Sequence, residues 1–541
     1  MKTKYIIPFF IALLFVGCDL DREPQDKIFS DSFWKTENDV TRALMGCYAH
    51  IPASVYNAYL DGYADNSYCQ YPWESKATVI SAGDITDNED FGYGFVGLRR
   101  FNYFLENVDK APISETLKKQ TKAEVRTLRA WFYFNLASRF GDVPLIKTYI
   151  TETEEGQIAP TSEKEVINFV ISELEQSIPD LPTNPSVKSR LGQAAAYAVK
   201  ARVHLFYGQY PQVVEATQAI MGMGYDLFKI KSDLGNEQDD YSKFIDFTND
   251  EHKQKFYSGL RSYEKLFWDE NKGNVEVIFN QEFIEDSFNY ISLYLLSSNA
   301  GGGWSSIAPT VDLVNAYWKS DGTTFTPPSA EQRKANYNDG KYKPEYLDEF
   351  KNRDTRLYAT ILYPGAIWKA NLGDDTFVWQ NNGKASNTSK TGYNYRKMVD
   401  PNGEDIYRKV NDFPLIRYAE VLLMYAEAQN EVAGADGTVY EALHKIRERV
   451  GMPDVAAGLS KEEMREVIRN ERRIELACEG HRWNDIRRWG ISSQVMKDIY
   501  SIHGELAQKR RWEDKFMRMP YPISAIDRNP KLKDAQKAKG Y

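Results

Sequence analysis

"RLGQAAAYAVKARVHLFYGQYPQVVEATQAIM", residues 190–221, has the pattern of two helices joined by a short turn. Gly192 and the alanines at 195, 196 and 198 keep one face of the first helix small, which allows a neighbouring helix to approach closely. The tetrapeptide "GQYP" supplies a glycine where the first helix ends and a proline where the second begins. The stretch therefore predicts a helical hairpin that buries its apolar face against other helices.

The same plan recurs elsewhere in the chain. "RYAEVLLMYAEAQNEV" (417–432) and "VYEALHKIRERVG" (439–451) form a second pair around a glycine-rich turn. A long helix is predicted over 117–140, where "GDVP" ends it, and the next helix starts at Thr161 or Ser162. Such pairs resemble tetratricopeptide (TPR) hairpins, in which each helix pair buries its face only against its neighbours.

Irregular spacing of the hairpins predicts a large insertion between them. We place a TPR-like scaffold at about residues 100–222 and 414–490 and the insertion at about 223–413. The insertion is rich in Gly, Asn, Tyr and Trp, and its "NVEVIFNQEF" segment predicts a strand. Loops of this length are usually functional or disordered, and so many aromatics argue against disorder. The expected fold class is therefore mainly α, a TPR-like superhelix with a loop-rich insertion.

The N-terminus has the pattern of an export signal. Lys2 and Lys4 precede "YIIPFFIALLFVG", which is shorter than the roughly 20 residues that cross a bilayer. The following "LFVGC" resembles a bacterial lipobox, with Phe15 where leucine is usual, and this resemblance implies lipid attachment at Cys18. The alternative is an ordinary signal peptide with an incidental cysteine. We therefore expect residues 1–17 to be removed as a lipoprotein signal peptide and 18–541 to form one domain.

Three cysteines remain after Cys18, so at most one intramolecular disulfide can form. Cys47 and Cys69 both lie in the N-terminal part of the chain, which favours them as the pair over Cys478.

The composition of the chain narrows the classes of ligand and partner that it could bind. The net charge of −9 over 541 residues is mild, and no basic tract carries interleaved aromatics, which argues against nucleic acid. The 13% aromatic content suits flat apolar ligands such as sugar rings if part of it lies at the surface.

Enzyme motifs are absent from the sequence. It contains no HExxH, no GxSxG and no phosphate-loop pattern, which predicts no catalytic residues. His481, in "EGHRW", is expected to make a structural hydrogen bond. Asp374 and Asp375 offer oxygen ligands, but no EF-hand pattern supports a calcium site, so we expect neither a metal nor a cofactor.

A row of carboxylates stands out near the C-terminus. Glu471, Glu475 and Glu479 are spaced at i, i+4 and i+8, with Arg472 and Arg473 beside them. A catalytic interpretation would make them paired acid and base, but the interleaved arginines favour an ion-pair network that fixes a helix against the scaffold.

Motifs spread over nearly the whole chain resemble the SusD/RagB family, surface lipoproteins of Bacteroidota that capture nutrients for an outer-membrane transporter. They are "DSFWKTENDV", "RTLRAWFYFNLASRFGDVPL", "SSIAPTVDLVNAYWKSDG", "RDTRLYATILYPG", "DFPLIRYAEVLLMYAEAQNEV", "RNERRIELACEGHRWNDIRRWG" and the closing "PYPISAIDRNPKLK". The resemblance implies a non-catalytic glycan-binding lipoprotein at the cell surface, anchored to the outer membrane. Its implied partner is a SusC-like TonB-dependent transporter, to which it would deliver oligosaccharide.

The resemblance also implies a ligand face outside the TPR-like scaffold, where an aromatic platform and polar side chains meet sugar rings. Two regions of this chain have that composition: "DGYADNSYCQYPW" (61–73) and the insertion. Trp304 follows glycines that we take to be flexible. From the polar and aromatic composition of these loops, we expect the ligand contacts to be Asp65, Asn66, Trp73, Trp304, Tyr393, Tyr395 and Arg396. Trp368 and Trp379 are further candidates.

Two other functions stay open from sequence. A protein of the same fold could bind peptides or another nutrient, for which a narrow acidic cavity would be typical. A surface glycosidase could use two distant carboxylates that form no motif.

Overall fold

The computed structural model describes residues 33–541 except for 153, 369–375, 403–404 and 406. The expected signal peptide 1–17, Cys18, Asp374 and Asp375 lie outside the described residues. In the part that is described, no helix is both long enough and apolar enough to cross a bilayer.

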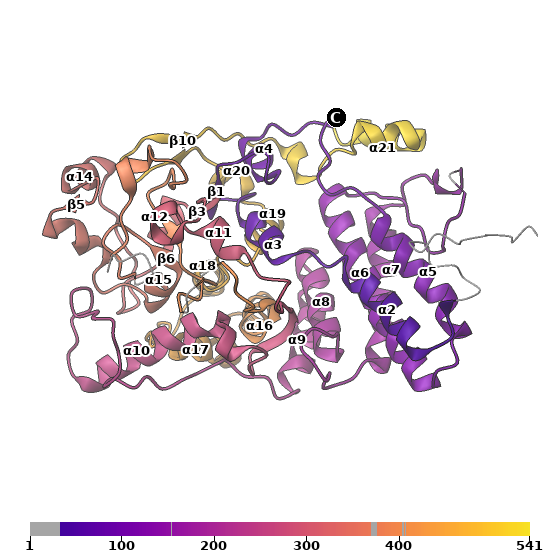
Figure 1. Cartoon of the computed structure of the whole chain (residues 1–541), viewed down its shortest axis with the longest axis horizontal. Coiled ribbons are helices and arrows are strands. Elements are labelled where there is room, and N and C mark those ends of the chain that lie inside the picture. The colour runs from indigo at the N-terminus through magenta and orange to yellow at the C-terminus, as the bar shows by residue number, and fades with distance from the viewer. Residues whose placement is uncertain (1–32, 153, 369–375, 403–404, 406) are drawn as a thin grey trace, which may run out of the picture.

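Paired helices form the scaffold, as the sequence predicts. They are α5 (Val96–Asn107), α6 (Glu115–Phe140), α7 (Glu163–Ser177), α8 (Gln193–Phe206), α9 (Tyr210–Met221), α16 (Tyr418–Ala433), α17 (Gly437–Arg449) and α18 (Lys461–Glu475). Helix α6 packs on α7, α8 on α9, and α16 on both α9 and α17. The second group of hairpins thus continues directly from the first, and the chain between α9 and α16 loops away from their junction (Figure 1).

Local sequence explains two of the scaffold helices, α6 and α8. Ser114 caps α6 by accepting a hydrogen bond from Leu117 N, and Gly141, at φ 74°, ends it. In α8 the alanines 194, 195, 196 and 198 are all buried, so the backbone of α8 lies close to its neighbours, as the opening stretch predicts.

The insertion is more helical than expected. It contains α10 (Asp250–Glu264), capped by Asn249, with Phe256, Tyr257, Leu260 and Tyr263 buried. Its apolar face is built largely from aromatics among many charged residues, so the sequence pattern is weak. The shorter α11 (Ile291–Leu295), α13 (Val311–Ala316), α14 (Ala330–Asn336) and α15 (Thr355–Thr360) follow.

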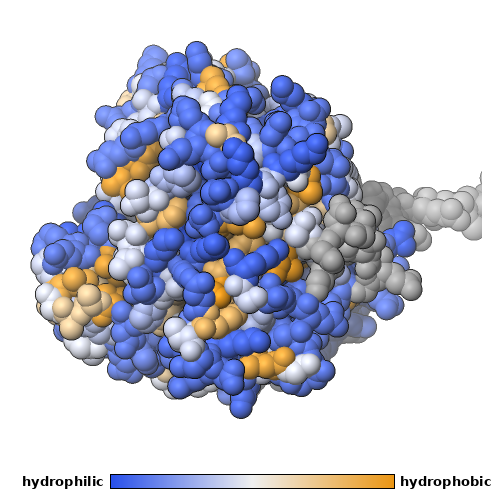
Figure 2. Space-filling view, turned by 90° about the vertical axis from the view of Figure 1, so that its left-hand side faces the viewer, coloured by the Kyte–Doolittle hydropathy of each residue, from blue (hydrophilic) through white to orange (hydrophobic). Residues whose placement is uncertain are grey.

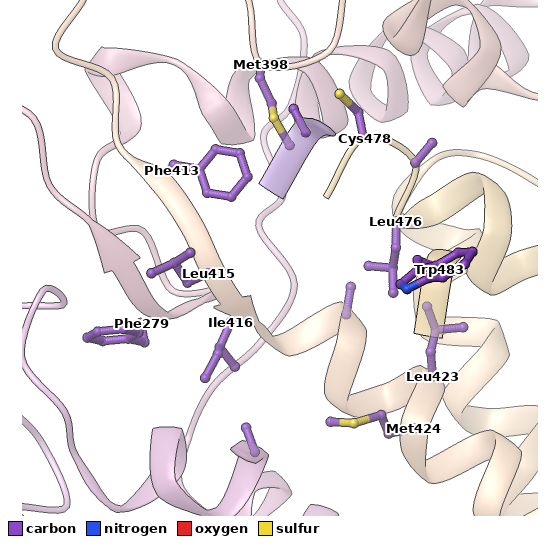
Figure 3. Packing of buried hydrophobic residues seen from close by; sticks show 14 of the residues in the cluster. Phe279, Met398, Phe413, Leu415, Ile416, Leu423, Met424, Leu476, Cys478 and Trp483 are labelled. Atoms are coloured by element: carbon purple, nitrogen blue, oxygen red, sulfur yellow. The ribbon is translucent and has the colours of Figure 1, made fainter. Parts of the chain in front are cut away.

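The predicted strand is confirmed as β2 (Val277–Gln281), which pairs antiparallel with β8 (Phe413–Arg417). In the register, Val277 faces Arg417 and Gln281 faces Phe413. This pair joins the insertion to the start of α16. Its apolar side chains belong to the same buried cluster as Leu423 and Met424 of α16 (Figure 3).

The carboxylates near the C-terminus form a buried ion-pair network, as interpreted from sequence. Glu475 accepts ion pairs from Arg356 (3.0 Å), Arg417 (2.8 Å) and Arg449. Glu479 pairs with Arg417 (2.7 Å) and Lys397 (2.6 Å). Helix α18 ends at Glu475, so Glu479 enters the network from the following turn and not from the helical face.

The pairing of Cys47 with Cys69, which the sequence favours over other pairings, is not formed. Cys47, Cys69 and Cys478 are all free thiols buried in the core. Burial raises the pKa of the Cys47 thiol to about 12, so this thiol stays protonated and unreactive. Proximity in sequence does not bring Cys47 and Cys69 together, because Cys47 faces α5, where its Sγ approaches Arg100 O at 3.9 Å.

Adding dithiothreitol is therefore expected to leave the thermal unfolding midpoint unchanged within about 1 °C, whereas losing a native disulfide costs about 2–5 kcal/mol. Differential scanning calorimetry with and without the reductant checks this. A fall of several degrees would contradict the free-thiol assignment.

The end of the molecule farthest from α5, α6 and α7, around α10, α14 and β5 (Lys341–Tyr342), is mainly hydrophilic, and its hydrophobic groups lie in separate patches (Figures 1 and 2). An aromatic platform has to be sought on another surface.

Candidate functional site

A short strand pair brings the two predicted ligand-binding regions together. β1 (Ser67–Cys69) pairs antiparallel with β3 (Ile307–Pro309). Residues that follow β1 therefore lie beside residues that precede β3. Gln70 continues the pairing: its backbone N–H donates to Ser306 O (3.2 Å) and its side chain donates to Trp304 O (2.9 Å). Trp73 and Trp304, distant in sequence, thus lie on neighbouring loops.

Both tryptophans present aromatic surface to solvent. Trp73 is 78% exposed and Trp304 is 37% exposed. Each is supported by a tyrosine. The ring centroids of Tyr71 and Trp73 are 5.0 Å apart at an interplanar angle of 32°. Those of Tyr294 and Trp304 are 5.3 Å apart, with the rings edge to face. The Tyr71 hydroxyl donates to Asn387 Oδ1 (2.9 Å), which ties this loop to the insertion. Supported rings of this kind lose little conformational freedom when a flat ligand stacks on them.

The glycines before Trp304 lie in close contact with neighbouring groups. Gly302 has φ 76°, and a Cβ there would lie 2.1 Å from the Tyr407 hydroxyl. A Cβ on Gly303 would lie 2.3 Å from Leu296 O. These positions are glycine because the backbone packs too closely for a side chain, and the packing holds Trp304 in place.

Beside Trp304 the surface is hollowed into a pocket of about 360 Å³, which we call the aromatic pocket. Its second wall is α3 (Ser54–Asp61). The residues that line it with aromatic or charged side chains are Tyr56, Tyr59, Tyr63, Glu74, Lys76, Asp90, Phe91, Arg139, Tyr294 and Trp304.

Fixed carboxylates lie among these rings. Glu74 Oε2 accepts a hydrogen bond from the Tyr59 hydroxyl (2.5 Å), and burial raises the pKa of Tyr59 well above its ordinary value, so Tyr59 stays the donor. Asp90 Oδ1 accepts from the backbone N–H groups of Gly92 (2.8 Å) and Tyr93 (2.7 Å). Both carboxylates keep oxygen lone pairs that can accept further hydrogen bonds.

Two cations are held at the same pocket. Lys76 Nζ pairs with Glu89 (2.5 Å). Arg139 donates to the Tyr56 hydroxyl (2.7 Å) and to Phe91 O (2.8 Å). The pocket therefore combines flat apolar faces with positioned donors and acceptors, which suits a ligand with both ring faces and hydroxyl groups.

Helix α3 is fastened to the C-terminal part of the chain. Asp61 accepts the backbone N–H of Cys478 (2.5 Å) and of Gly480 (3.2 Å). Cys478 has φ 67°, a backbone conformation that residues other than glycine rarely adopt, and its hydrogen bond to the Asp61 carboxylate holds it there. Burial raises the pKa of Asp61 to about 6.

The structure corrects the expectation for Asp65 and Asn66. Asp65 is 3% exposed and binds Arg482 through both oxygens (2.7 and 2.9 Å) and Arg473 (2.9 Å). These arginines outweigh burial and hold the pKa of the Asp65 carboxyl well below its usual range. Asn66 is buried and accepts from Arg473 Nε (2.8 Å). Both side chains continue the attachment of α3 and do not face a ligand.

Tyr393, Tyr395 and Arg396 are also buried, contrary to a surface role. Tyr395 belongs to β7 (Asn394–Tyr395), and its hydroxyl lies 2.7 Å from Ser67 Oγ, beneath the β1–β3 pair. Arg396 Nε donates to Glu264 (2.8 Å) at the end of α10. Of the three, Tyr395 supports the β1–β3 pair from below.

The two further candidate tryptophans are likewise packed in the interior. Trp368 and Trp379 are at most 4% exposed. Their indole N–H groups donate to Ala300 O (2.6 Å) and Ser389 O (2.7 Å).

Sequence reasoning missed Tyr56, Tyr59, Glu74, Asp90 and Tyr294. Tyr71 and Glu74 flank Trp73 in "YPWE", which was a usable local signal. The others carry none, because only the β1–β3 pairing and the attachment of α3 bring them together.

A scaffold of TPR-like helical hairpins that carries a long insertion with a loop-built aromatic pocket defines the class of this protein. Comparison with known proteins identifies the family. A model described as "SusD family" matches residues 264–541, and one described as "Starch-binding associating with outer membrane" matches residues 20–205. The chain belongs to the SusD family.

The similarity to relatives extends over nearly the whole chain. SusD-like protein P2 of Formosa agariphila is 25% identical, with 98% of each chain covered. A SusD-like protein of Bacteroides fragilis superposes with a TM-score of 0.79 at 26% identity, over 94% of this chain and 99% of that chain. A SusD-like carbohydrate binding protein of the same species gives 0.75 at 26% identity, over 93% and 100%.

Proposed function

We propose that this protein captures glycans at the aromatic pocket without cleaving them. The observation that carries the proposal is the pair of exposed, tyrosine-supported tryptophans, Trp73 and Trp304, on neighbouring loops beside a pocket with fixed polar groups. The C–H faces of sugar rings stack on indole rings, while Glu74 and Asp90 accept from the hydroxyls at the ring edges. Two separated platforms favour an oligosaccharide over a monosaccharide.

The relatives support this ligand class. One structural neighbour at 26% identity is described as a carbohydrate binding protein. A laminarin binding SusD-like protein, at 21% identity and a TM-score of 0.65, shares the fold. These descriptions name binding and no reaction.

A glycan panel tests the proposal. Isothermal titration of neutral oligosaccharides against the purified protein is expected to give saturable binding, and chromatography of the same mixtures after prolonged incubation is expected to return intact glycan. Release of shorter sugars would support the glycosidase alternative. Saturable binding of peptides, with no glycan bound, would support the peptide-binding alternative.

We further propose that the protein works at the outer membrane beside a SusC-like TonB-dependent transporter, into which it delivers oligosaccharide. The support is family membership and the description "associating with outer membrane" of the model that matches the N-terminal part. Copurification of such a transporter with the affinity-tagged protein from outer membranes is expected.

Cys18→Ala is expected to abolish membrane association, because stable anchoring requires the acyl chains, at about 0.8 kcal/mol per buried CH₂. Fractionation of cells that express each form measures this. Cys47→Ala is the matched control and should remain in the membrane fraction; a Cys18→Ala protein that remained there too would refute lipid anchoring at this residue.

A further inference from the structure

One wall of the aromatic pocket is a segment that forms neither helix nor strand. Residues 84–93, which we call the wall loop, follow α4 (Ala77–Ala82) and supply Asp90 and Gly92 to the pocket. Within the loop, Asp90 Oδ1 accepts from the backbone N–H groups of Gly92 and Tyr93. These local bonds shape a turn but do not attach it to the rest of the molecule. The position of the Asp90 carboxylate therefore depends on what packs behind the loop.

The C-terminal part of the chain packs there. Residues 519–523, "MPYPI", join two parts of the pocket wall. Met519 N donates to Arg139 O (2.8 Å), near the end of α6. Ile523 N donates to Asp87 O (2.8 Å), in the wall loop. In Figure 1 the C-terminus accordingly lies at the same edge of the molecule as α4.

Between these two hydrogen bonds, the ring of Tyr521 is wedged against both parts of the wall. Its centroid lies 5.3 Å from that of Tyr93 in the wall loop. It also lies 6.5 Å from that of Phe140 at the end of α6, with the rings stacked at an interplanar angle of 17°. Because a close-packed interior transmits displacements, a shift of Tyr521 would shift the wall loop.

One side chain fixes the backbone of Tyr521. Gln536 of α22 (Lys533–Ala538) is 5% exposed and binds both polar backbone groups of that residue. Its Oε1 accepts from Tyr521 N (2.8 Å), and its Nε2 donates to Tyr521 O (3.2 Å). Pro520 and Pro522 flank Tyr521 and carry no N–H, so these two hydrogen bonds anchor the middle of the segment.

The residue that follows α22 reinforces this attachment. Lys539 Nζ lies 3.1 Å from the centre of the Tyr521 ring and donates to Met519 O (3.3 Å). Gln536 and Lys539 both lie outside the lining of the aromatic pocket. The end of the chain thus reaches the pocket only through residues 519–523.

We infer that Gln536 is a positioning residue of the aromatic pocket. By holding Tyr521, it keeps the wall loop, and with it the Asp90 carboxylate, where a ligand hydroxyl can donate to it. The inference rests on the proposed glycan function, because Asp90 is one of the acceptors assigned there. It gives the last residues of the chain a part in ligand affinity although they touch no ligand.

Hydrogen exchange tests the inference without a ligand. Gln536→Met removes both hydrogen bonds to Tyr521 and keeps most of the side-chain volume. We expect the Gly92 and Tyr93 amides to exchange about tenfold faster in this variant, measured by mass spectrometry of the peptides that span them. Unaltered exchange in the folded variant would overturn the inference.

Asn430→Leu is the matched control for that experiment. Asn430 of α16 is also a buried amide whose nitrogen donates to a backbone carbonyl, Lys461 O (3.0 Å), but it lies in the scaffold. This variant should leave exchange of the wall loop unchanged. Equal acceleration in both variants would show a general loss of stability and would contradict a specific role of Gln536.

Glycan affinity tests the route by which Gln536 acts. Titration calorimetry with the best glycan from the panel is expected to show about a fivefold loss for Gln536→Met, the size of one weakened hydrogen bond. In an Asp90→Asn background, where that acceptor is already replaced, the further loss should fall below about twofold. In a Trp73→Ala background it should stay at about fivefold. Equal further losses in the two backgrounds would rule out action through the wall loop.

The two measurements separate this inference from the proposed function. If no glycan binds the unmodified protein, the proposed function fails, and hydrogen exchange alone decides whether Gln536 holds the wall loop. If Gln536→Met does not fold, exchange of the unmodified protein decides. The Tyr521, Gly92 and Tyr93 amides should then open together, with protection factors that agree within about tenfold. A wall loop with weaker protection than that would refute the attachment.

Discussion

Arg417→Met is expected to lower the free energy of unfolding by about 3–5 kcal/mol. Arg417 is 1% exposed and binds Glu276, Glu475 and Glu479, at 2.7–2.8 Å. Its guanidinium also donates to Glu475 O (2.9 Å). Methionine fills most of the volume but leaves buried carboxylates without part of their compensating charge, and the cost of an unpaired buried charge dominates the loss.

Guanidinium unfolding followed by tryptophan fluorescence measures the effect. Arg408→Met is the matched control, because Arg408 is 70% exposed and its pairing with Asp405 spans 3.7 Å. An exposed pair contributes less than about 1 kcal/mol, so the control should change little. If both variants lost the same small amount of stability, the network would not be the element that holds the insertion to α16 and α18.

Trp304→Ala is expected to weaken binding of the best glycan from the panel by at least about 2 kcal/mol, which is roughly thirtyfold. Trp304 supplies the stacking surface at the mouth of the aromatic pocket, and Tyr294 and the packed glycines hold it in place without help from the ligand. Truncation therefore removes contact area that was already organised for binding. Trp73→Ala should cost a similar amount, and the double variant should show no measurable binding.

Titration calorimetry measures these losses, with circular dichroism to establish that each variant folds. Tyr342→Ala is the matched control, because Tyr342 is also 37% exposed but lies on β5, outside the pocket. Unchanged affinity in both folded tryptophan variants would remove the aromatic pocket as the glycan site.

Helix periodicity made most of the scaffold predictable, because alanine-rich faces such as that of α8 admit few structures other than close helix packing. The exposed aromatic surface formed by Trp73 and Trp304 was predictable in part. Trp73 and Trp304 sit in irregular loops, but Trp368 and Trp379 do so too and are buried, so loop position alone does not decide exposure.

Asp65, Asn66, Tyr393, Tyr395 and Arg396 were mistaken for ligand contacts because loop polarity does not distinguish a side chain that meets solvent from one that meets a buried arginine. The buried position of the Asp65 side chain depends on its ion pairs with Arg473 and Arg482, which lie more than four hundred positions away along the chain. Contacts at that separation leave no local pattern, and the same holds for Tyr56 and Asp90 in the pocket.

The attachment of α3 sets the order in which the protein becomes competent to bind. Asp61 and Asp65 reach residues 473–482, separated from them by up to 419 positions in sequence. Closing so long a loop is slow and follows the folding of local hairpins. The wall of the aromatic pocket that comes from the beginning of the chain is therefore completed only after the end of the chain has folded. A chain truncated before Arg482 is therefore expected to form its first helical hairpins but not a complete aromatic pocket.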